Sequence, residues 1–190
     1  MYGAAGDGAD AAIQKLLCDA LKAAGAKRVR LDVGHVAVFR SIVHAARAGA
    51  ELEAELFEAL QRKDRPEIER LARPLERSTR EALLLLPQLY GGPEVLAVAA
   101  RRLPNILQLR SALRTLRTLA KASPVPVSFD LAELRGYHYH SGVVFDAYCD
   151  GVAGAVARGG RYDEVGKAFG RARPATGFSI DLRAVAEVVK

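Results

Sequence analysis

The chain has 190 residues, of which 50% are hydrophobic and 26% are charged. This composition excludes a fully disordered chain, and the length suits one domain or at most two small ones. The formal net charge of +6 is compatible with an anionic partner such as a nucleic acid, although a solvated, arginine-rich surface explains it more simply.

Membrane insertion and secretion find no support in the sequence. The purely apolar runs, such as Leu83–Pro87, are far shorter than the roughly 20 residues that span a bilayer. Residues 1–12 lack the basic start and apolar core of a secretory signal. Cys18 and Cys149 stand far apart and outside any CxxC pattern, which argues against a disulfide scaffold or a zinc site. We therefore expect a cytoplasmic protein.

Residues 1–40 predict a helix followed by a strand. Apolar residues recur at helical spacing between Ile13 and Ala24, with Asp7 or Asp10 as the cap and Gly25 as the end. Residues 29–33 then alternate between apolar and polar side chains, which is the period of a half-buried strand.

Residues 41–121 read as almost entirely helical, and several prolines divide them into short helices. Asp64 predicts a helix start, with Pro66 in the first turn and Glu67 reaching back to the cap. Asn105 is expected to cap the last of these helices. We interpret this region as a helical insertion.

The last helix of the insertion has one basic face, made by Arg110, Arg114, Arg117 and Lys121. An amphipathic helix facing solvent is the simple explanation of this pattern. Contact with an anionic partner, such as RNA, is the alternative.

Residues 122–190 change to short, β-rich segments. Strands are predicted at 125–129, 142–148, 153–158 and 175–180, before a closing helix from about Leu182. Strands joined by tight turns favour an antiparallel sheet. We therefore predict an α+β fold in which residues 1–40 and 122–190 form one unit, an antiparallel sheet flanked by helices, and 41–121 form the insertion.

The residues with the clearest chemical potential are Arg135 to Asp146. Gly136 and Gly142 bracket a run of aromatic and imidazole side chains, so backbone can approach a ligand while the rings line a pocket. His138 and His140 are two residues apart, but a zinc ion needs a further ligand that no spacing supplies. We expect no metal and no cofactor.

A second cluster lies in residues 157–163. Arg158 and Arg161 can hold a carboxylate or a phosphate, beside Tyr162 and a pair of glycines. A hairpin with an internal Arg161–Asp163 interaction is an equally good explanation. Neither a phosphate-binding GxxxxGK[ST] loop nor an activated nucleophile is present in the sequence.

These residues carry a family resemblance. The segment Arg135–Phe145 resembles the histidine-specific signature of histidyl-tRNA synthetases, Arg-Gly-Leu-Asp-Tyr-Tyr-Thr-Gly-Thr-Val-Phe. Residues 159–163 resemble the next synthetase signature, and Thr176–Ile180 resembles the strand of motif 3. His140 stands in place of the second signature tyrosine, and Ala184 in place of the motif 3 arginine that binds ATP. The fold implied is that of class II aminoacyl-tRNA synthetases.

With these departures, the sequence resembles the ATP phosphoribosyltransferase regulatory subunits, a synthetase-like family that serves the first step of histidine biosynthesis. The resemblance implies a non-catalytic subunit without aminoacylation activity. It implies assembly with the short-form catalytic subunit, self-association and feedback control by histidine. The implied histidine-type pocket consists of Arg135, Gly136, Tyr137, Tyr139, His140 and Gly142, with Arg158, Arg161 and Tyr162 as further pocket or anion contacts.

Members of that family begin with a segment that carries synthetase motifs 1 and 2. Tyr2-Gly3-Ala4 resembles the sequence just after motif 2, so we expect an N-terminally truncated chain. Two other functions stay open: a fragment of an active histidyl-tRNA synthetase, and an RNA-binding module that uses the basic face of the last insertion helix.

Overall fold

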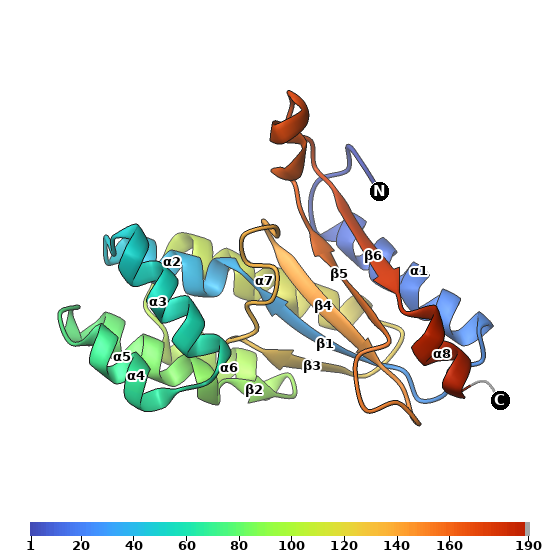
Figure 1. The fold of residues 1–190 in the computed structure, drawn as a ribbon, viewed down its shortest axis with the longest axis horizontal. Helices are drawn as coiled ribbons and strands as arrows, with labels where there is room; N and C mark the ends of the chain where they lie inside the picture. The colour runs from blue at the N-terminus through green and yellow to red at the C-terminus, as the bar shows by residue number, and fades with distance from the viewer. Residues whose placement is uncertain (189–190) are drawn as a thin grey trace.

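The computed structural model describes residues 1–188, which form one sheet with helices behind it and a block of helices at one end (Figure 1). The sheet has six strands in the order β2-β3-β1-β4-β5-β6. In chain order the strands are β1 Arg30–His35, β2 Tyr90–Gly91, β3 Val127–Asp130, β4 Val143–Tyr148, β5 Ala157–Arg161 and β6 Thr176–Ile180.

Two long helices cover one face of the sheet, and five shorter ones make up the helical block (Figure 1). The covering helices are α1 Asp7–Ala23 and α7 Leu107–Ala122. The block consists of α2 Ala37–Ala45, α3 Ala50–Gln61, α4 Arg65–Ala72, α5 Arg77–Leu85 and α6 Glu94–Arg102. The short 3-10 helices are η1 Leu86–Gln88 and η2 Val165–Phe169, and α8 Leu182–Val188 follows β6. No helix among residues 1–188 is both long and apolar enough to cross a membrane.

The predicted α+β fold with a sheet flanked by helices is confirmed, with one correction to the strand directions. Strands β4, β5 and β6 pair antiparallel, as does β1 with β4, but β1 pairs parallel with β3. The chain leaves β1, passes through the helical block and returns along α7 to β3. Such a long connection is what a parallel pair requires.

Strand β5 lies further along the chain than predicted. The sequence favoured residues 153–158, but β5 spans Ala157–Arg161 and therefore contains Gly159 and Gly160. Glycines inside a strand often mark a close approach of other atoms rather than a turn. A Cβ on Gly159 would lie 2.5 Å from the ring of Phe145, so this position of the strand requires glycine.

Helix α1 begins as predicted near Asp7, but neither aspartate caps it. The N-cap is Gly6, and no side chain caps the helix. The Asp7 carboxylate instead accepts a hydrogen bond from Thr115 Oγ1 of α7 at 2.8 Å. Asp10 is only 2% exposed and forms an ion pair with Arg161. Both side chains therefore connect α1 to its neighbours.

Two of the predicted helix starts in the block have different outcomes. The Asp64 cap is confirmed, because Asp64 Oδ1 accepts a hydrogen bond from the backbone N–H of Glu67 at 3.1 Å. The Glu67 side chain does not reach back, since it pairs with Arg70 at 2.7 Å. The predicted Asn105 cap of α7 is wrong: the N-cap is Ile106, and Asn105 Oδ1 accepts a hydrogen bond from Arg110 Nε.

The basic face of α7 is partly used inside the fold. The Arg110 guanidinium donates to the carbonyl of Ala100, and Arg117 Nη2 donates to the carbonyl of Leu96 at 3.1 Å. Both carbonyls belong to α6, so these two arginines contribute to the packing of α6 against α7. Only part of the face is left to meet an anionic partner.

Helix α7 joins the two predicted units. It packs against α2 and α6 in the helical block and against α1, β1 and β4 in the sheet layer. The buried apolar residues also form one continuous cluster from α1 through the block to β4. The division into residues 1–40 with 122–190 and 41–121 therefore describes chain order, while the core is shared.

Candidate functional site

A hollow of about 300 Å³ opens over the strands β5 and β6. The helices α1 and α7 cover the other face of the sheet (Figure 1). Its walls come from the glycine-bracketed segment before β4, from β5 and the residues after it, and from β6. It is lined by Tyr139, His140, Arg158, Gly159, Gly160, Tyr162, Gly177, Phe178 and Ser179.

The imidazole of His140 is held between two glycines. A Cβ on Gly136 would lie 2.6 Å from His140 Cδ2, and one on Gly160 would lie 2.8 Å from His140 Cε1. Gly136 also has a positive φ of 69°, which other residues adopt only with strain. These two positions need glycine because the ring occupies the space that a side chain would fill.

Hydrogen bonding decides which tautomer the neutral imidazole adopts. His140 Nδ1 lies 3.2 Å from the carbonyl oxygen of Arg161. A carbonyl only accepts hydrogen bonds, so Nδ1 carries the proton and Nε2 is left as an acceptor. Burial lowers the pKa of His140, against a smaller opposite effect of the Arg161 hydrogen bond. At neutral pH the hollow therefore presents a neutral imidazole.

Two tyrosines complete the aromatic wall. The Tyr139 ring lies 5.2 Å from the His140 ring in an edge-on arrangement and 5.2 Å from the Tyr162 ring, centroid to centroid. The hydroxyl of Tyr162 lies so close over Gly177 that a Cβ there would approach it to 2.6 Å. Glycines thus form the floor and aromatic rings form the walls, which suits a small ligand with a planar group.

A row of polar side chains crosses the same sheet face beside the hollow. Cross-strand register aligns them on neighbouring strands, from β3 through β1, β4 and β5 to β6: Ser128, Asp32, Asp146, Arg158 and Ser179. Arg158 links the row to the hollow, because it lines the hollow and its Nε lies 3.7 Å from Asp146 Oδ1.

The two carboxylates of this row are directly opposite each other on β1 and β4. Burial raises the pKa of Asp32; Asp130, Glu133 and Asp146 add to the rise, while the hydrogen bond from Ser128 opposes it. Burial also raises the pKa of Asp146, against the nearby Arg135 charge. The row therefore concentrates negative charge at a site already partly removed from water.

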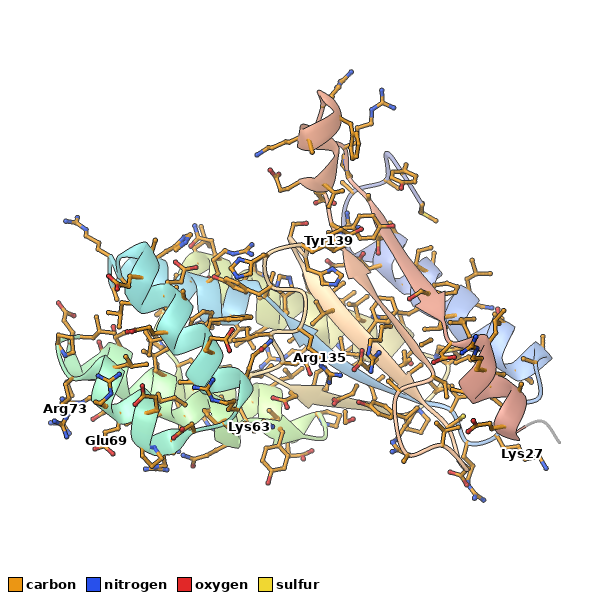
Figure 2. The ribbon with its side chains drawn as sticks, viewed as in Figure 1. Lys27, Lys63, Glu69, Arg73, Arg135 and Tyr139 are labelled. Atoms are coloured by element: carbon orange, nitrogen blue, oxygen red, sulfur yellow. The ribbon has the colours of Figure 1, made fainter. Side chains whose placement is uncertain are left out.

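Arg135 does not line the hollow. Figure 2 shows it over the middle of the sheet, with Tyr139 nearer the end of β5. Its guanidinium pairs with Glu133 at 2.7 Å and with Asp146 at 3.1 Å. It lines a separate cavity of about 430 Å³ with Lys63, Asp130 and Glu133. Its charge is therefore balanced by carboxylates of the protein.

Tyr137 and Arg161 are also placed away from the hollow's surface. Tyr137 is 3% exposed and packs against the helical block. Arg161 is 8% exposed and pairs with Asp10 at 2.9 Å and Asp163 at 3.0 Å. The Arg161–Asp163 contact foreseen in the hairpin alternative is therefore present, although the glycines before it lie in a strand.

Arg161 organises the end of the sheet beneath the hollow. Its carbonyl accepts the hydrogen bond from the N–H of Ser141 at 2.8 Å. Ser141 Oγ in turn accepts from the N–H of Asp163 at 2.9 Å. A Cβ on Gly142 would lie 3.0 Å from Arg161 Cδ, so Gly142 allows the two segments to approach. Sequence patterns did not reveal Asp10 as the partner of Arg161, because the two residues are far apart in the chain.

Ala184 lies on α8, partly buried against the core. Asp181 Oδ1 accepts hydrogen bonds from the backbone N–H groups of Arg183 and Ala184 and so caps that helix. A methyl group cannot bind an anion, so this position offers nothing to a nucleotide. His138 and His140 do not act together either, since His138 packs against Phe57 with ring centroids 5.3 Å apart. Within residues 1–188 no group of three potential metal ligands is present.

Comparison with known proteins gives this fold and site a family. The model of the family described as histidyl-tRNA synthetase matches residues 1–185. A crystal structure from Bacillus halodurans C, described as an ATP phosphoribosyltransferase regulatory subunit/histidyl-tRNA synthetase, superposes with a TM-score of 0.88 at 25% identity. The superposed region covers 100% of this chain and 52% of the Bacillus halodurans chain. The chain belongs to the histidyl-tRNA synthetase family.

The sequence relatives are more specific. The ATP phosphoribosyltransferase regulatory subunit of Azoarcus sp. (strain BH72) is 52% identical over 187 residues, which cover 98% of this chain and 49% of the relative. The regulatory subunit of Ralstonia nicotianae is 53% identical over 189 residues, with 99% and 49% coverage. The resemblance to ATP phosphoribosyltransferase regulatory subunits is thereby confirmed. The chain spans about half the length of these curated relatives.

Proposed function

We propose that this chain acts as the regulatory, non-catalytic subunit of an ATP phosphoribosyltransferase, in the first step of histidine biosynthesis. Its partner is then the short-form catalytic subunit, and histidine is the effector. The identity of 52% to a protein named as such a subunit, over 98% of this chain, is the observation that carries the proposal. Self-association and a cytoplasmic location belong to the same proposal.

The site supports a binding role without chemistry. The hollow has aromatic walls and a neutral imidazole, whereas Ala184 occupies the position at which the synthetases bind ATP through an arginine. A pocket can keep its ligand after its chemistry is lost. A ligand that prefers one conformation of a complex shifts the equilibrium of its partner by the difference between the two affinities.

The proposed effector site is the hollow itself. Arg158 is placed to receive the carboxylate of an amino acid, and His140 Nε2 to accept a hydrogen bond from an N–H of its side chain. Tyr139 and Tyr162 would flank the planar ring. Gly136 and Gly142 keep the backbone close, while Arg135, Tyr137 and Arg161 support the walls from outside rather than touch the ligand.

A turnover assay tests this function. The short-form catalytic subunit receives ATP and phosphoribosyl pyrophosphate, with no addition, with this chain, or with the longer Azoarcus relative, and histidine is then titrated. We expect activation that histidine reverses. Activation by the relative alone would place the coupling outside the residues of this chain, and absence of activation by both proteins contradicts the proposal.

An active histidyl-tRNA synthetase is the second candidate, because that family's model matches residues 1–185. Exchange of pyrophosphate into ATP that depends on histidine separates the two functions. We expect no exchange, since Ala184 leaves the ATP position without a cation. Robust exchange by this chain favours the synthetase.

A further inference from the structure

Arg40 of α2 reaches from the helical block to the segment that forms the wall of the hollow. Its Nη2 donates to the carbonyl oxygen of Tyr137 at 2.9 Å and to that of His140 at 3.3 Å. The guanidinium also lies 4.7 Å from the centre of the Tyr137 ring, within the range of a cation–π contact. One side chain thus contacts both ends of the four-residue run 137–140.

The block holds Tyr137 by a second set of contacts. Its ring lies 5.4 Å from the ring of Phe39 on α2 and 5.4 Å from that of Phe57 on α3. Its hydroxyl donates to Glu53 Oε1 of α3 at 2.6 Å. Tyr137 is thereby fixed at the block, and it provides a stable base from which Tyr139 and His140 extend into the hollow.

The wall needs such external contacts because it lies outside any strand. Residues 137–140 form no sheet ladder, and Gly136 has a φ of 69°. Its local backbone hydrogen bonds run from the N–H of Tyr137 to the carbonyl of Leu134, at 2.9 Å, and from those of Tyr139 and His140 to the carbonyl of Gly136, at 2.8 and 2.7 Å. The carbonyls of Tyr137 and His140 have Arg40 as their common donor.

We propose that Arg40 is a positioning residue of the hollow, which fixes the His140 imidazole and the Tyr139 ring by holding the carbonyls of Tyr137 and His140. The affinity of the hollow for its ligand is then set in part by a helix that does not line it. The identity of the ligand rests on the proposed function, but the positioning of His140 does not.

The surroundings of Arg40 distinguish positioning from general support of the core. The side chain is half-buried, and it lines a second hollow of about 350 Å³ with Ser41, His44 and Ile106. The core around α2 is made by other residues, among them Phe39 and Ile42, which are 0% and 1% exposed. Removal of the guanidinium should therefore loosen the wall more than it destabilises the fold.

Three variants test the proposal: Arg40→Ala, Arg40→Lys and, as a control, Arg62→Ala. Arg62 belongs to the same helical block, and its partner among residues 1–188 is Glu58, at 3.6 Å on an exposed surface. The first readout is the pH titration of the His140 imidazole by nuclear magnetic resonance, which needs no ligand. The second is the histidine affinity by calorimetry. Thermal unfolding reports on the fold.

In Arg40→Ala the imidazole becomes better hydrated, so the His140 pKa should move up toward its ordinary value. His140 is surrounded by the rings of Tyr139 and Tyr162 and the carbonyl of Arg161, and it shares the hollow with the charged Arg158; the variant keeps all of these groups. Histidine affinity should fall roughly tenfold. Arg40→Lys should show smaller changes of both kinds, because an ammonium group can still donate to one carbonyl.

The proposal is overturned if His140 titrates in Arg40→Ala as in the parent, or if Arg62→Ala changes it equally. If Arg40→Ala fails to fold, Arg40→Lys decides: an unchanged His140 titration overturns the proposal. Failure of the parent chain to bind histidine would contradict the effector role, whereas the titration would still decide on Arg40.

Discussion

The backbone of Gly160 lies directly against the imidazole of His140: a Cβ on residue 160 would come within 2.8 Å of both Cε1 and Nδ1. The same Cβ would lie 2.5 Å from the carbonyl oxygen of Val143, which is backbone and cannot move aside. Gly160→Ala should therefore displace the ring and strain the β4–β5 pair, at a cost of about 1–3 kcal/mol in the free energy of unfolding. Urea unfolding measures this cost.

Gly154→Ala is the matched control, since nothing lies within 4 Å of a Cβ at that position. It should leave the unfolding free energy within about 0.5 kcal/mol of the parent. Equal stability of the two variants would contradict the close packing of His140 on β5.

The ion pair between Arg161 and Asp10 is the most buried one described, with side-chain exposures of 9% and 3%. Asp10→Asn keeps the shape but leaves the guanidinium with one carboxylate, Asp163. We expect a loss of about 2–3 kcal/mol of unfolding free energy, because a buried charge then lacks a partner. The urea midpoint should fall accordingly.

Asp19→Asn provides the comparison, because Asp19 pairs with Lys15 at the surface, with side-chain exposures of 55% and 64%. Removal of such an exposed pair should change the unfolding free energy by less than about 1 kcal/mol. If the two variants lose the same amount, burial does not set the strength of the Arg161 pair.

Much of the fold follows from local sequence patterns. The helical spacing from Ile13 onward and the Asp64 cap are decided by neighbouring residues, and the structure confirms both. Long-range contacts decide the remainder. The sequence around Asn105 matches a cap, yet that side chain bonds Arg110 instead. Gly159 and Gly160 resemble a turn, but the rings of Phe145 and His140 require glycine inside a strand.

The sequence motif identified the segment that contributes to the candidate site, but it did not predict which of its side chains line the hollow. The run from Arg135 to Gly142 suggested a single pocket. In the structure these residues have different surroundings: Tyr139 and His140 line the hollow, Tyr137 packs against the helices and Arg135 pairs with Glu133. Which way each side chain points depends on the turn at Gly136, whose φ of 69° no local pattern reveals.

His35 makes stability depend on pH. It accepts a hydrogen bond at Nδ1 from the N–H of Ala37 at 3.2 Å, which only the neutral ring can do. Burial, helped by the charge of Arg40 and opposed by Asp7, lowers its pKa from 6.5 to about 4. Below pH 6.5 the unfolded chain gains a proton that the folded chain does not bind, so His35 should cost the fold about 3 kcal/mol between pH 7 and pH 4.

His35→Asn isolates this effect, because the amide oxygen can replace Nδ1 as acceptor and does not titrate. The unfolding free energy of the variant should fall less steeply than that of the parent as the pH drops from 7 to 4. Parallel curves for the two proteins would show that His35 is not the group responsible.

Asp32 and Asp146, opposite each other on β1 and β4, should respond differently to neutralisation. Burial and the neighbouring carboxylates raise the pKa of Asp32, so its contribution to stability is lost as the pH rises through the folded pKa. Asp32→Asn should therefore raise the unfolding free energy at pH 7 by about 0.5–1 kcal/mol. The gain should disappear at low pH, where the parent carboxyl is also neutral.

Asp146→Asn tests whether the gain comes from the like-charge pair alone. Asp146 lies 3.1 Å from Arg135 and 3.7 Å from Arg158, so its removal relieves the same repulsion but takes a carboxylate from two guanidinium groups. Because burial still raises the pKa of Asp146 while Arg135 opposes the rise, we expect a gain in stability at pH 7 that is smaller than for Asp32→Asn. If both variants stabilise the chain equally in urea unfolding, the ion pairs of Asp146 with the two arginines contribute nothing measurable to the free energy of unfolding.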